Sequence, residues 1–174
     1  MPRATIDLMD PADLSIVKGQ WRFAPGLVPG EPNEGLVSQL TGSPARLPGY
    51  DDSGWEATND LARWHSKGLT FAWYRIRVTL PETVNGQDIR ESRCLFETCI
   101  DDYGELWIDG ECNRDRGAVQ GFNVPQRVVV SAEPQPGTEH TIALLAMNGP
   151  IAAPGGAVFV RWAQLGFEWR TPGY

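Results

Sequence analysis

The chain has 174 residues and a formal net charge of −7, and its 15 lysines and arginines form no cluster. Proteins that bind nucleic acids or anionic membranes rely on cationic contacts, so this composition argues against both kinds of partner. The length fits a single domain, spanning residues 1–174, that can bury a substantial core. The 19 glycines and 14 prolines, many of them between short apolar runs, favour a turn-rich all-β sandwich over a helical fold.

Targeting signals and cofactor motifs are not found in the sequence. No apolar run has the length of a signal peptide or of a membrane span. The cysteines, Cys94, Cys99 and Cys112, are odd in number and lack the paired spacing of a zinc site, which fits a reducing compartment. There is no glycine-rich phosphate loop, His-Glu helix motif or Gly-x-Ser-x-Gly elbow. These features predict a cytoplasmic protein without a cofactor.

The first third of the chain is irregular. Asp10 followed by Pro11 is a typical helix start, so one helical turn is expected before the first strand. Residues 25–48 are rich in proline and glycine and have little periodicity, which predicts a long surface loop with at most one short strand at Leu36–Leu40. An acidic turn, Tyr50–Trp55, follows this loop.

Residues 58–68 form the chain's richest polar and aromatic loop, which contains Trp64 and His65. An indole beside hydrogen-bonding groups suits sugar recognition, because the C–H face of a pyranose is apolar while its hydroxyls need paired donors and acceptors. The alternative is that Trp64 caps the edge of the sandwich and that His65 is a solvated loop residue.

The segment Phe71–Leu80 alternates between two faces and predicts a strand. The face expected to enter the core carries Ala72, Tyr74, Ile76, Val78 and Leu80. Trp73 and Arg75 point the other way, where an indole beside a guanidinium can serve either as a ligand platform or as simple coverage of the sheet.

The stretch Cys94–Glu111 predicts a buried strand, a polar corner, a second strand and a tight turn. Leu106 and Ile108 alternate with Trp107 in the second strand, where we expect Trp107 to be a buried core aromatic. Asp109-Gly110 is a preferred pair for a two-residue hairpin turn. This stretch therefore supplies much of the core.

The corner of that stretch carries Asp101, Asp102 and Tyr103 between two apolar runs. One interpretation is a solvated turn in which an aspartate accepts hydrogen bonds from nearby backbone amides. The other is a rim that contacts a sugar or a cation.

The last third continues the β pattern. Residues 114–123 have no apolar period and predict a polar loop near the corner, whereas Val128–Val130 and Thr141–Met147 predict buried strands. Asn148 follows the second of them. Ala157–Trp169 forms the closing strand or strands, and a final strand returning beside the first is how a jelly roll closes.

Six segments, in the same order along the chain, resemble the sugar-binding jelly-roll domain of glycoside hydrolase family 2. Ile100–Gly110 is similar to the family's V-D-x-x-x-x-V-W-V-N-G pattern. The other five segments are Leu14–Phe23, Tyr50–Trp55, Phe71–Pro81, Gly121–Pro125 and Pro136–Leu144. The resemblance implies a galactose-binding-like jelly-roll β-sandwich.

The resemblance also implies a class of function. Family 2 enzymes keep their catalytic acid and nucleophile on a separate barrel domain, for which this chain leaves no room. We therefore expect a non-catalytic carbohydrate-binding module, or an accessory subunit of a glycosidase, that recognises a soluble saccharide or glycoside. In the family an asparagine follows the strand that corresponds to Thr141–Met147, and Asn148 matches it. The family's Trp-Tyr-Arg, matched by Trp73–Arg75, is mainly structural. The resemblance therefore favours the interpretation that Trp73 and Arg75 cover the sheet and do not bind a ligand.

The candidate ligand residues come from the polar loops and strand ends, which we expect to meet at one end of the sandwich. They are Trp64, His65, Asp101, Asp102, Tyr103, Arg116, Asn123 and Asn148. The alternative hypothesis is a small stand-alone enzyme acting on a sugar or glycosylated product, with His65 and either Asp101 or Asp102 as acid and base. A structural Ca²⁺ would use hard oxygen ligands such as Asp51, Asp52, Asp101 and Asp102, although no ligand spacing in the sequence is diagnostic of a metal site.

Overall fold

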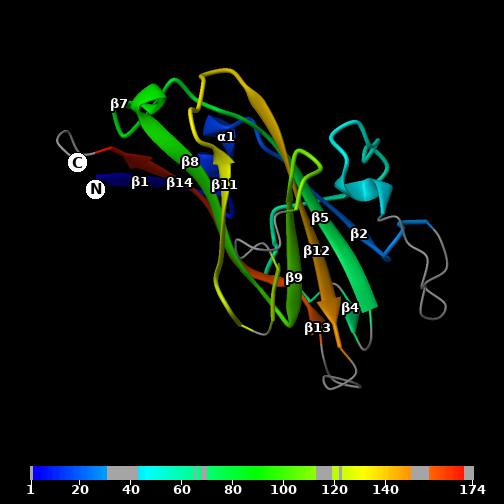
Figure 1. The fold of residues 1–174 in the computed structure, drawn as a ribbon. Helices are drawn as coiled ribbons and strands as arrows, with labels where there is room; N and C mark the ends of the chain where they lie inside the picture. The colour runs from blue at the N-terminus through cyan, green and yellow to red at the C-terminus, as the bar shows by residue number, and fades with distance from the viewer. Residues whose placement is uncertain are drawn as a thin grey trace.

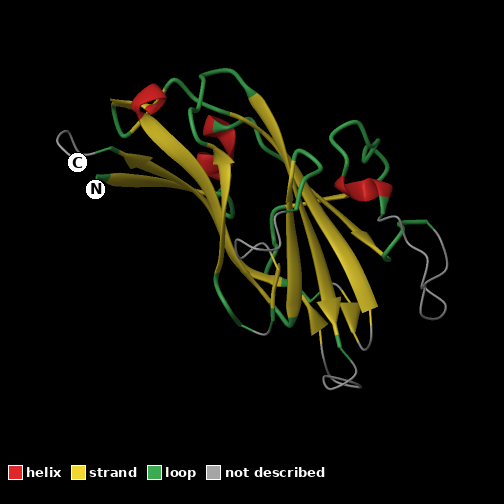
Figure 2. Cartoon of the chain, viewed as in Figure 1, coloured by secondary structure: helices red, strands yellow, loops and turns green. Residues whose placement is uncertain are grey.

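The computed structural model describes residues 2–30, 43–64, 66–67, 70–112, 119–121, 123–149 and 157–170. Within these ranges two antiparallel sheets pack face to face, and the helical segments are short (Figures 1 and 2). The prediction of an all-β sandwich is confirmed. No helix in the described part of the chain is long and apolar enough to cross a membrane.

The first sheet has four strands in the order β1-β14-β8-β11. Their bounds are β1 (Arg3–Asp7), β14 (Val160–Trp169), β8 (Ser92–Ile100) and β11 (Gln126–Ser131). β14 pairs with β1 from Arg3 opposite Glu168 to Asp7 opposite Gln164. The closing strand thus returns beside a strand at Arg3–Asp7 that was not predicted, whereas the strand expected to open the chain, after the helical turn, is β2 (Trp21–Pro25) of the second sheet; the prediction that these two pair is wrong.

The second sheet has six strands in the order β10-β9-β12-β5-β2-β3. Their bounds are β10 (Val119–Gln120), β9 (Tyr103–Ile108), β12 (Glu139–Asn148), β5 (Thr70–Thr79), β2 (Trp21–Pro25) and β3 (Glu56–Thr58). β9 ends in the predicted two-residue turn, where Asp109 and Gly110 have φ angles of 50° and 87°. Two successive residues with positive φ are what a type I′ hairpin turn requires.

Smaller elements connect the sheets. Two short ladders join β4 (Ser66–Lys67) to β13 (Ala157–Val158) and β6 (Thr83–Val84) to β7 (Gln87–Asp88). The helical turns are α1 (Pro11–Ile16), η1 (Pro44–Arg46) and η2 (Ile89–Glu91). The Asp10 carboxylate caps α1 by accepting from the Ala12 amide at 2.7 Å, so the predicted helix start is confirmed. Its predicted position before the first strand is wrong, because β1 precedes α1. The expected strand at Leu36–Leu40 lies outside the described residues.

The main core lies between the inner faces of the two sheets. β5 contributes Ala72, Tyr74, Ile76 and Val78, with Leu80 just beyond its end, as the alternation predicts, and β8 and β14 contribute Phe96 and Phe167. Trp21 of β2 is fully buried, and its Nε1 donates to the Leu8 carbonyl at 2.8 Å. The apolar area that both sheets remove from water is the main stabilising contribution of this fold.

Two sequence-based predictions about burial are wrong. Val128–Val130 is not a continuously buried run, because Val129 is 45% exposed while its neighbours face the core. The reason is that β11 is an edge strand with one face in solvent. Trp107 is only half-buried and lies in a smaller apolar cluster on the outer face of the second sheet, with the Arg46 guanidinium 5.4 Å from its ring centre.

Candidate functional site

The outer face of β5 is occupied by protein, not open to a ligand. Trp73 is 1% exposed and Arg75 is 0% exposed, because the segment that includes η1 and the following turn lies over them. Arg75 Nε donates to Asp52 Oδ2 at 2.8 Å, and its Nη1 donates to the carbonyls of Ala45 and, at 3.1 Å, Leu47. The prediction that these side chains cover the sheet is borne out by their burial.

Aromatic rings complete this arrangement. The Arg75 guanidinium carbon lies 5.5 Å from the ring centre of Tyr50 and 6.0 Å from that of Trp55. Arg77 Nη1 donates to the other carboxylate oxygen of Asp52 at 2.9 Å. We call these five residues, Tyr50, Asp52, Trp55, Arg75 and Arg77, the clamp.

Electrostatics bind the clamp together. Burial by itself raises the pKa of the Asp52 carboxyl group, but hydrogen bonds and the positive charges of Arg75 and Arg77 outweigh burial and leave the pKa lowered. Asp52 is therefore a charged partner of two arginines under ordinary conditions. A carboxylate engaged in this way has a structural role.

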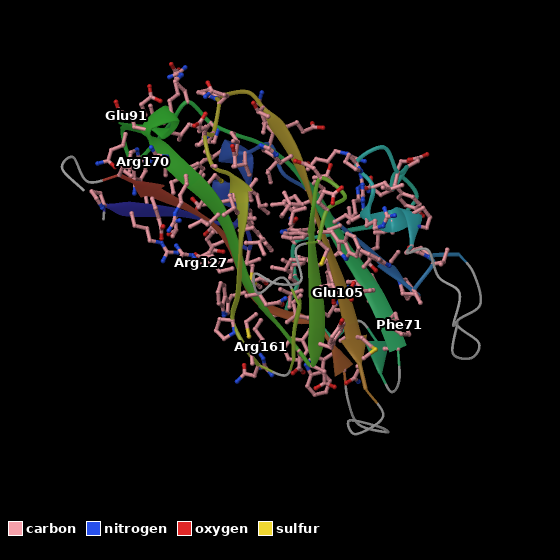
Figure 3. The ribbon with its side chains drawn as sticks, viewed as in Figure 1. Phe71, Glu91, Glu105, Arg127, Arg161 and Arg170 are labelled. Atoms are coloured by element: carbon pink, nitrogen blue, oxygen red, sulfur yellow. The ribbon has the colours of Figure 1, made fainter. Side chains whose placement is uncertain are left out.

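A second aromatic and charged group lies at the end of the sandwich where β8 turns into β9. Trp64 is 61% exposed, and its ring stacks on Phe159 with 6.3 Å between centroids and an interplanar angle of 24°. The Arg161 guanidinium carbon lies 4.9 Å from the Phe159 ring centre, and Arg161 Nη2 donates to Asp101 Oδ1 at 2.8 Å. We call Trp64, Asp101, Phe159 and Arg161 the rim; Figure 3 shows Arg161 at the lower end of the first sheet.

Backbone hydrogen bonds hold the segments of the rim together. The Asp101 amide donates to the Phe159 carbonyl at 3.1 Å, which ties the corner to the chain just before β14. The Val160 amide donates to the Leu61 carbonyl at 2.9 Å, which ties the loop carrying Trp64 to the same strand. Three segments far apart in sequence therefore meet at this end, among them the 58–68 loop and the corner, which were expected to lie close together.

Asp102 and Asn148 lie at the same end, at the close of β12. Asp102 Oδ2 accepts from the Gly149 amide at 3.3 Å. The Asn148 side chain is 1% exposed, and neither its Nδ2 nor its Oδ1 has a hydrogen-bond partner in the described part of the chain. By alternation along β12, Asn148 is on the inner face with Leu144 and Ala146.

The remaining predicted ligand residues that the structure describes, Asn123 and Tyr103, lie in two different places. Asn123 Oδ1 accepts from the Cys99 thiol at 3.6 Å. Burial raises the pKa of that thiol. Tyr103 instead belongs to the outer face of the second sheet, where its hydroxyl donates to Glu105 Oε1 at 2.7 Å. The proposal that Tyr103 contacts a ligand together with the corner carboxylates stays a prediction.

Two further candidates cannot be placed. His65 and Arg116 lie outside the described residues. Acid–base chemistry by His65 with Asp101 or Asp102 thus remains a sequence-based hypothesis, in which both carboxylates already have the protein partners given above.

The aspartates considered as calcium ligands are not gathered at one point. Asp52 belongs to the clamp and Asp51 accepts from the Ser53 amide in the same turn, whereas Asp101 and Asp102 lie at the corner. Across the described residues, no group of three or more histidine, cysteine or acidic side chains is arranged to hold a metal ion.

Two rim residues were not predicted as site residues. Val158–Arg161 alternates, because Val158 and Val160 are buried while Phe159 is partly buried and Arg161 is exposed. An aromatic and an arginine on the outward side of a strand end would have been the signal. The prediction of closing strands over Ala157–Trp169 does not by itself say which of their side chains face outward.

Comparisons with known proteins find the fold but no sequence family. No protein-family model matches the chain, and no curated protein matches it in sequence. Among solved structures, 95% of the chain superposes on part of a β-glucuronidase from Bacteroides uniformis with a TM-score of 0.61 and 17% identity. It matches a glycosyl hydrolase family 2 member from Bacteroides cellulosilyticus (94% covered, TM-score 0.59, 12% identity) and a β-glucuronidase from Ruminococcus gnavus (96% covered, TM-score 0.57, 11% identity).

The match covers only a fraction of each of those proteins. The chain spans 18%, 20% and 29% of the three neighbours in the order given. At identities this low the similarity establishes a shared fold and nothing about shared activity. The chain therefore has the all-β sandwich fold of a part of family 2 glycosidases.

Proposed function

We propose that this chain is a non-catalytic carbohydrate-binding module, or an accessory subunit of a glycosidase, that recognises a soluble saccharide or glycoside at the rim. The observation that carries the proposal is the exposed Trp64 indole stacked on Phe159 beside the Arg161–Asp101 pair. A pyranose can lay its C–H face on such an indole and direct its hydroxyls to neighbouring charged groups.

The surroundings of the rim support the same proposal. Within the described residues, the donor Nδ2 and the acceptor Oδ1 of Asn148 have no hydrogen-bond partner, and a donor beside an acceptor is the pattern that a hydroxyl complements. Leaving both unpaired in a buried position is unfavourable, so a partner that reaches the end of β12 gains from satisfying them. Glucuronides are sensible first ligands because two of the structural neighbours are described as β-glucuronidases.

Calorimetry against a panel of mono- and disaccharides, glucuronides included, tests the proposal. Trp64→Ala is expected to weaken binding by roughly 1–3 kcal/mol without changing the melting temperature, because an exposed indole gives its area to the ligand and little to the core. Asp102→Asn keeps an acceptor for the Gly149 amide but loses a charge-assisted bond to a hydroxyl, so it is expected to bind more weakly with an unchanged fold.

Product analysis on the same samples addresses the enzyme hypothesis. If the wild type converts a ligand and Asp102→Asn binds it equally well but converts it far more slowly, the chain is an enzyme and the non-catalytic proposal is wrong. If the wild type neither binds nor converts any member of the panel, both hypotheses fail.

A further inference from the structure

The sequence contains two Asn-Gly pairs, Asn85-Gly86 and Asn148-Gly149. Asparagine is a thermolabile residue, because its side-chain amide can be attacked by the backbone nitrogen of the next residue. A following glycine favours this attack, since it has no side chain to hinder the approach and its backbone rotates freely. The fold places the two pairs in opposite surroundings.

Asn85 and Gly86 form the exposed turn between β6 and β7. Their φ angles are 51° and 78°, and Val84 pairs with Gln87 across the turn, as in a two-residue type I′ hairpin. Among the described residues, neither the Asn85 side chain nor the Gly86 amide has a hydrogen-bond partner, and a Cβ added at Gly86 would meet no atom within 4 Å. Both reacting groups are therefore open to solvent.

The ladder that holds this turn is short. β6 and β7 pair through Thr83 with Asp88 and through Val84 with Gln87, and they form a separate sheet of two strands. A hairpin of two strands is only marginally stable in water. Attack of the Gly86 nitrogen requires rotation about the Cα–C bond of Asn85, and local opening of this short ladder is enough to allow it.

The fold constrains the second pair. Asn148 is 1% exposed and ends β12, a central strand in which it pairs with Thr70 of β5. The Gly149 amide donates to Asp102 Oδ2 at 3.3 Å. This carboxylate opposes loss of the amide proton, because a second negative charge beside the first is unfavourable. Rotation at Asn148 would also have to break this hydrogen bond and disturb the end of a central strand.

We propose that Asn85 is a site of spontaneous deamidation and that the fold protects Asn148 from the same reaction. The deprotonated Gly86 nitrogen attacks the side-chain carbonyl carbon of Asn85. A nitrogen–carbon bond forms, the bond to the side-chain nitrogen breaks, and ammonia leaves. Water, the co-reactant, then opens the resulting succinimide at either carbonyl and leaves aspartate or isoaspartate at position 85.

The isoaspartate product lengthens the main chain by a methylene group, which a two-residue turn cannot accept without losing its pairing. The hairpin leads into η2, where Ile89 is buried, and the Asp88 carbonyl accepts from Trp169 Nε1 at 2.7 Å. Figure 1 shows β7 at the opposite end of β8 from the corner that leads into β9. Deamidation is therefore expected to lower stability at this end of the sandwich and to leave the rim intact.

Peptide mapping by mass spectrometry tests the proposal on the full chain, incubated at neutral to mildly alkaline pH. Conversion of Asn85 is expected to be at least about tenfold faster than conversion of Asn148, because a short hairpin opens more often than a central strand. A higher pH should speed the reaction at Asn85, since the attacking group is the deprotonated amide. A sample unfolded in denaturant gives the rates without the fold, and there both pairs are expected to react at similar rates.

Asn85→Gly is the matched variant, because a Gly-Gly pair suits the same turn type but has no side-chain amide. After incubation the wild type is expected to melt at a lower temperature than fresh protein, whereas Asn85→Gly should keep its melting temperature. An equal loss in both would contradict the assignment of the effect to position 85. Folded wild type in which Asn85 stays intact while the unfolded sample reacts, or in which Asn148 reacts as fast as Asn85, would overturn the proposal.

Discussion

The clamp and the rim are built from the same kinds of side chain but differ in what those side chains face. Each combines aromatic rings, an arginine and an aspartate: Tyr50, Trp55, Arg75 and Asp52 in the clamp, and the four rim residues at the end of the sandwich. In the clamp the ion pair is 0% and 6% exposed, whereas in the rim the corresponding values are 34% and 14%.

The difference shows that residue type alone does not separate a structural cluster from a candidate binding site. The clamp holds the segment around η1 onto the outer face of the second sheet through Arg75 Nε and Nη1, whereas the buried Arg75 Nη2 has no hydrogen-bond partner in the described part of the chain. The rim leaves the face of one indole to solvent. Substitutions in the clamp are therefore expected to lower the free energy of unfolding strongly, and substitutions in the rim only slightly.

The largest effect is expected from Asp52→Ala. Removing the carboxylate leaves Arg75 buried without its charge partner, and breaking a buried ion pair in this way typically destabilises a protein by about 3–5 kcal/mol. Denaturant unfolding measures the change. If Asp52→Ala lowers the free energy of unfolding by less than about 1 kcal/mol, the clamp contributes no more to stability than the rim does.

Trp73→Ala is expected to have an effect of similar or slightly smaller size. Its side chain is 1% exposed and its Nε1 donates to the Leu27 carbonyl at 2.9 Å, so truncation leaves a cavity and removes this hydrogen bond. Losses of about 3–5 kcal/mol are typical for buried aromatics. Thermal unfolding compares the two variants, and Trp73→Ala is expected to melt at a clearly lower temperature than Trp64→Ala. Equal melting temperatures would contradict the assignment of Trp73 to a structural role and of Trp64 to the rim.

Acid should weaken the clamp. Because the pKa of Asp52 is lowered in the folded protein, its contribution to stability is fully present above the unfolded pKa of about 3.9 and is lost as the pH falls through the lower folded pKa. The unfolding free energy of the wild type should therefore decline below about pH 4. Asp52→Asn is expected to show a shallower decline in that range, and a parallel decline would remove Asp52 as the cause.

The smallest effect on stability is expected from Asp101→Ala in the rim. Its partner Arg161 is partly exposed, so the released cation can be hydrated, and ion pairs of this kind contribute about 0.2–1 kcal/mol. The same denaturant experiment used for Asp52→Ala measures it. A loss as large as that of Asp52→Ala would show that the rim supports the fold as much as the clamp does.

Local patterns predicted much of this architecture. The period of two in Phe71–Leu80 and the Asp109-Gly110 pair identified the core face of β5 and the hairpin correctly, because both depend on neighbouring residues alone. Burial of the face carrying Trp73 and Arg75 depends on residues about 20 to 30 positions away, and periodicity could not supply it. The stacking of Phe159 on Trp64 likewise depends on a tertiary contact.

The measurement that tests the account most directly compares Trp64→Ala with Trp55→Ala in two assays, saccharide calorimetry and thermal unfolding. Each variant is expected to change the result of one assay and not of the other. Trp64→Ala should lose affinity and keep its melting temperature, whereas Trp55→Ala should unfold earlier, having lost a ring beside Arg75, and keep its affinity while folded. Trp64→Ala that binds like the wild type, or Trp55→Ala that loses binding while still folded, would contradict the assignment of the ligand to the rim.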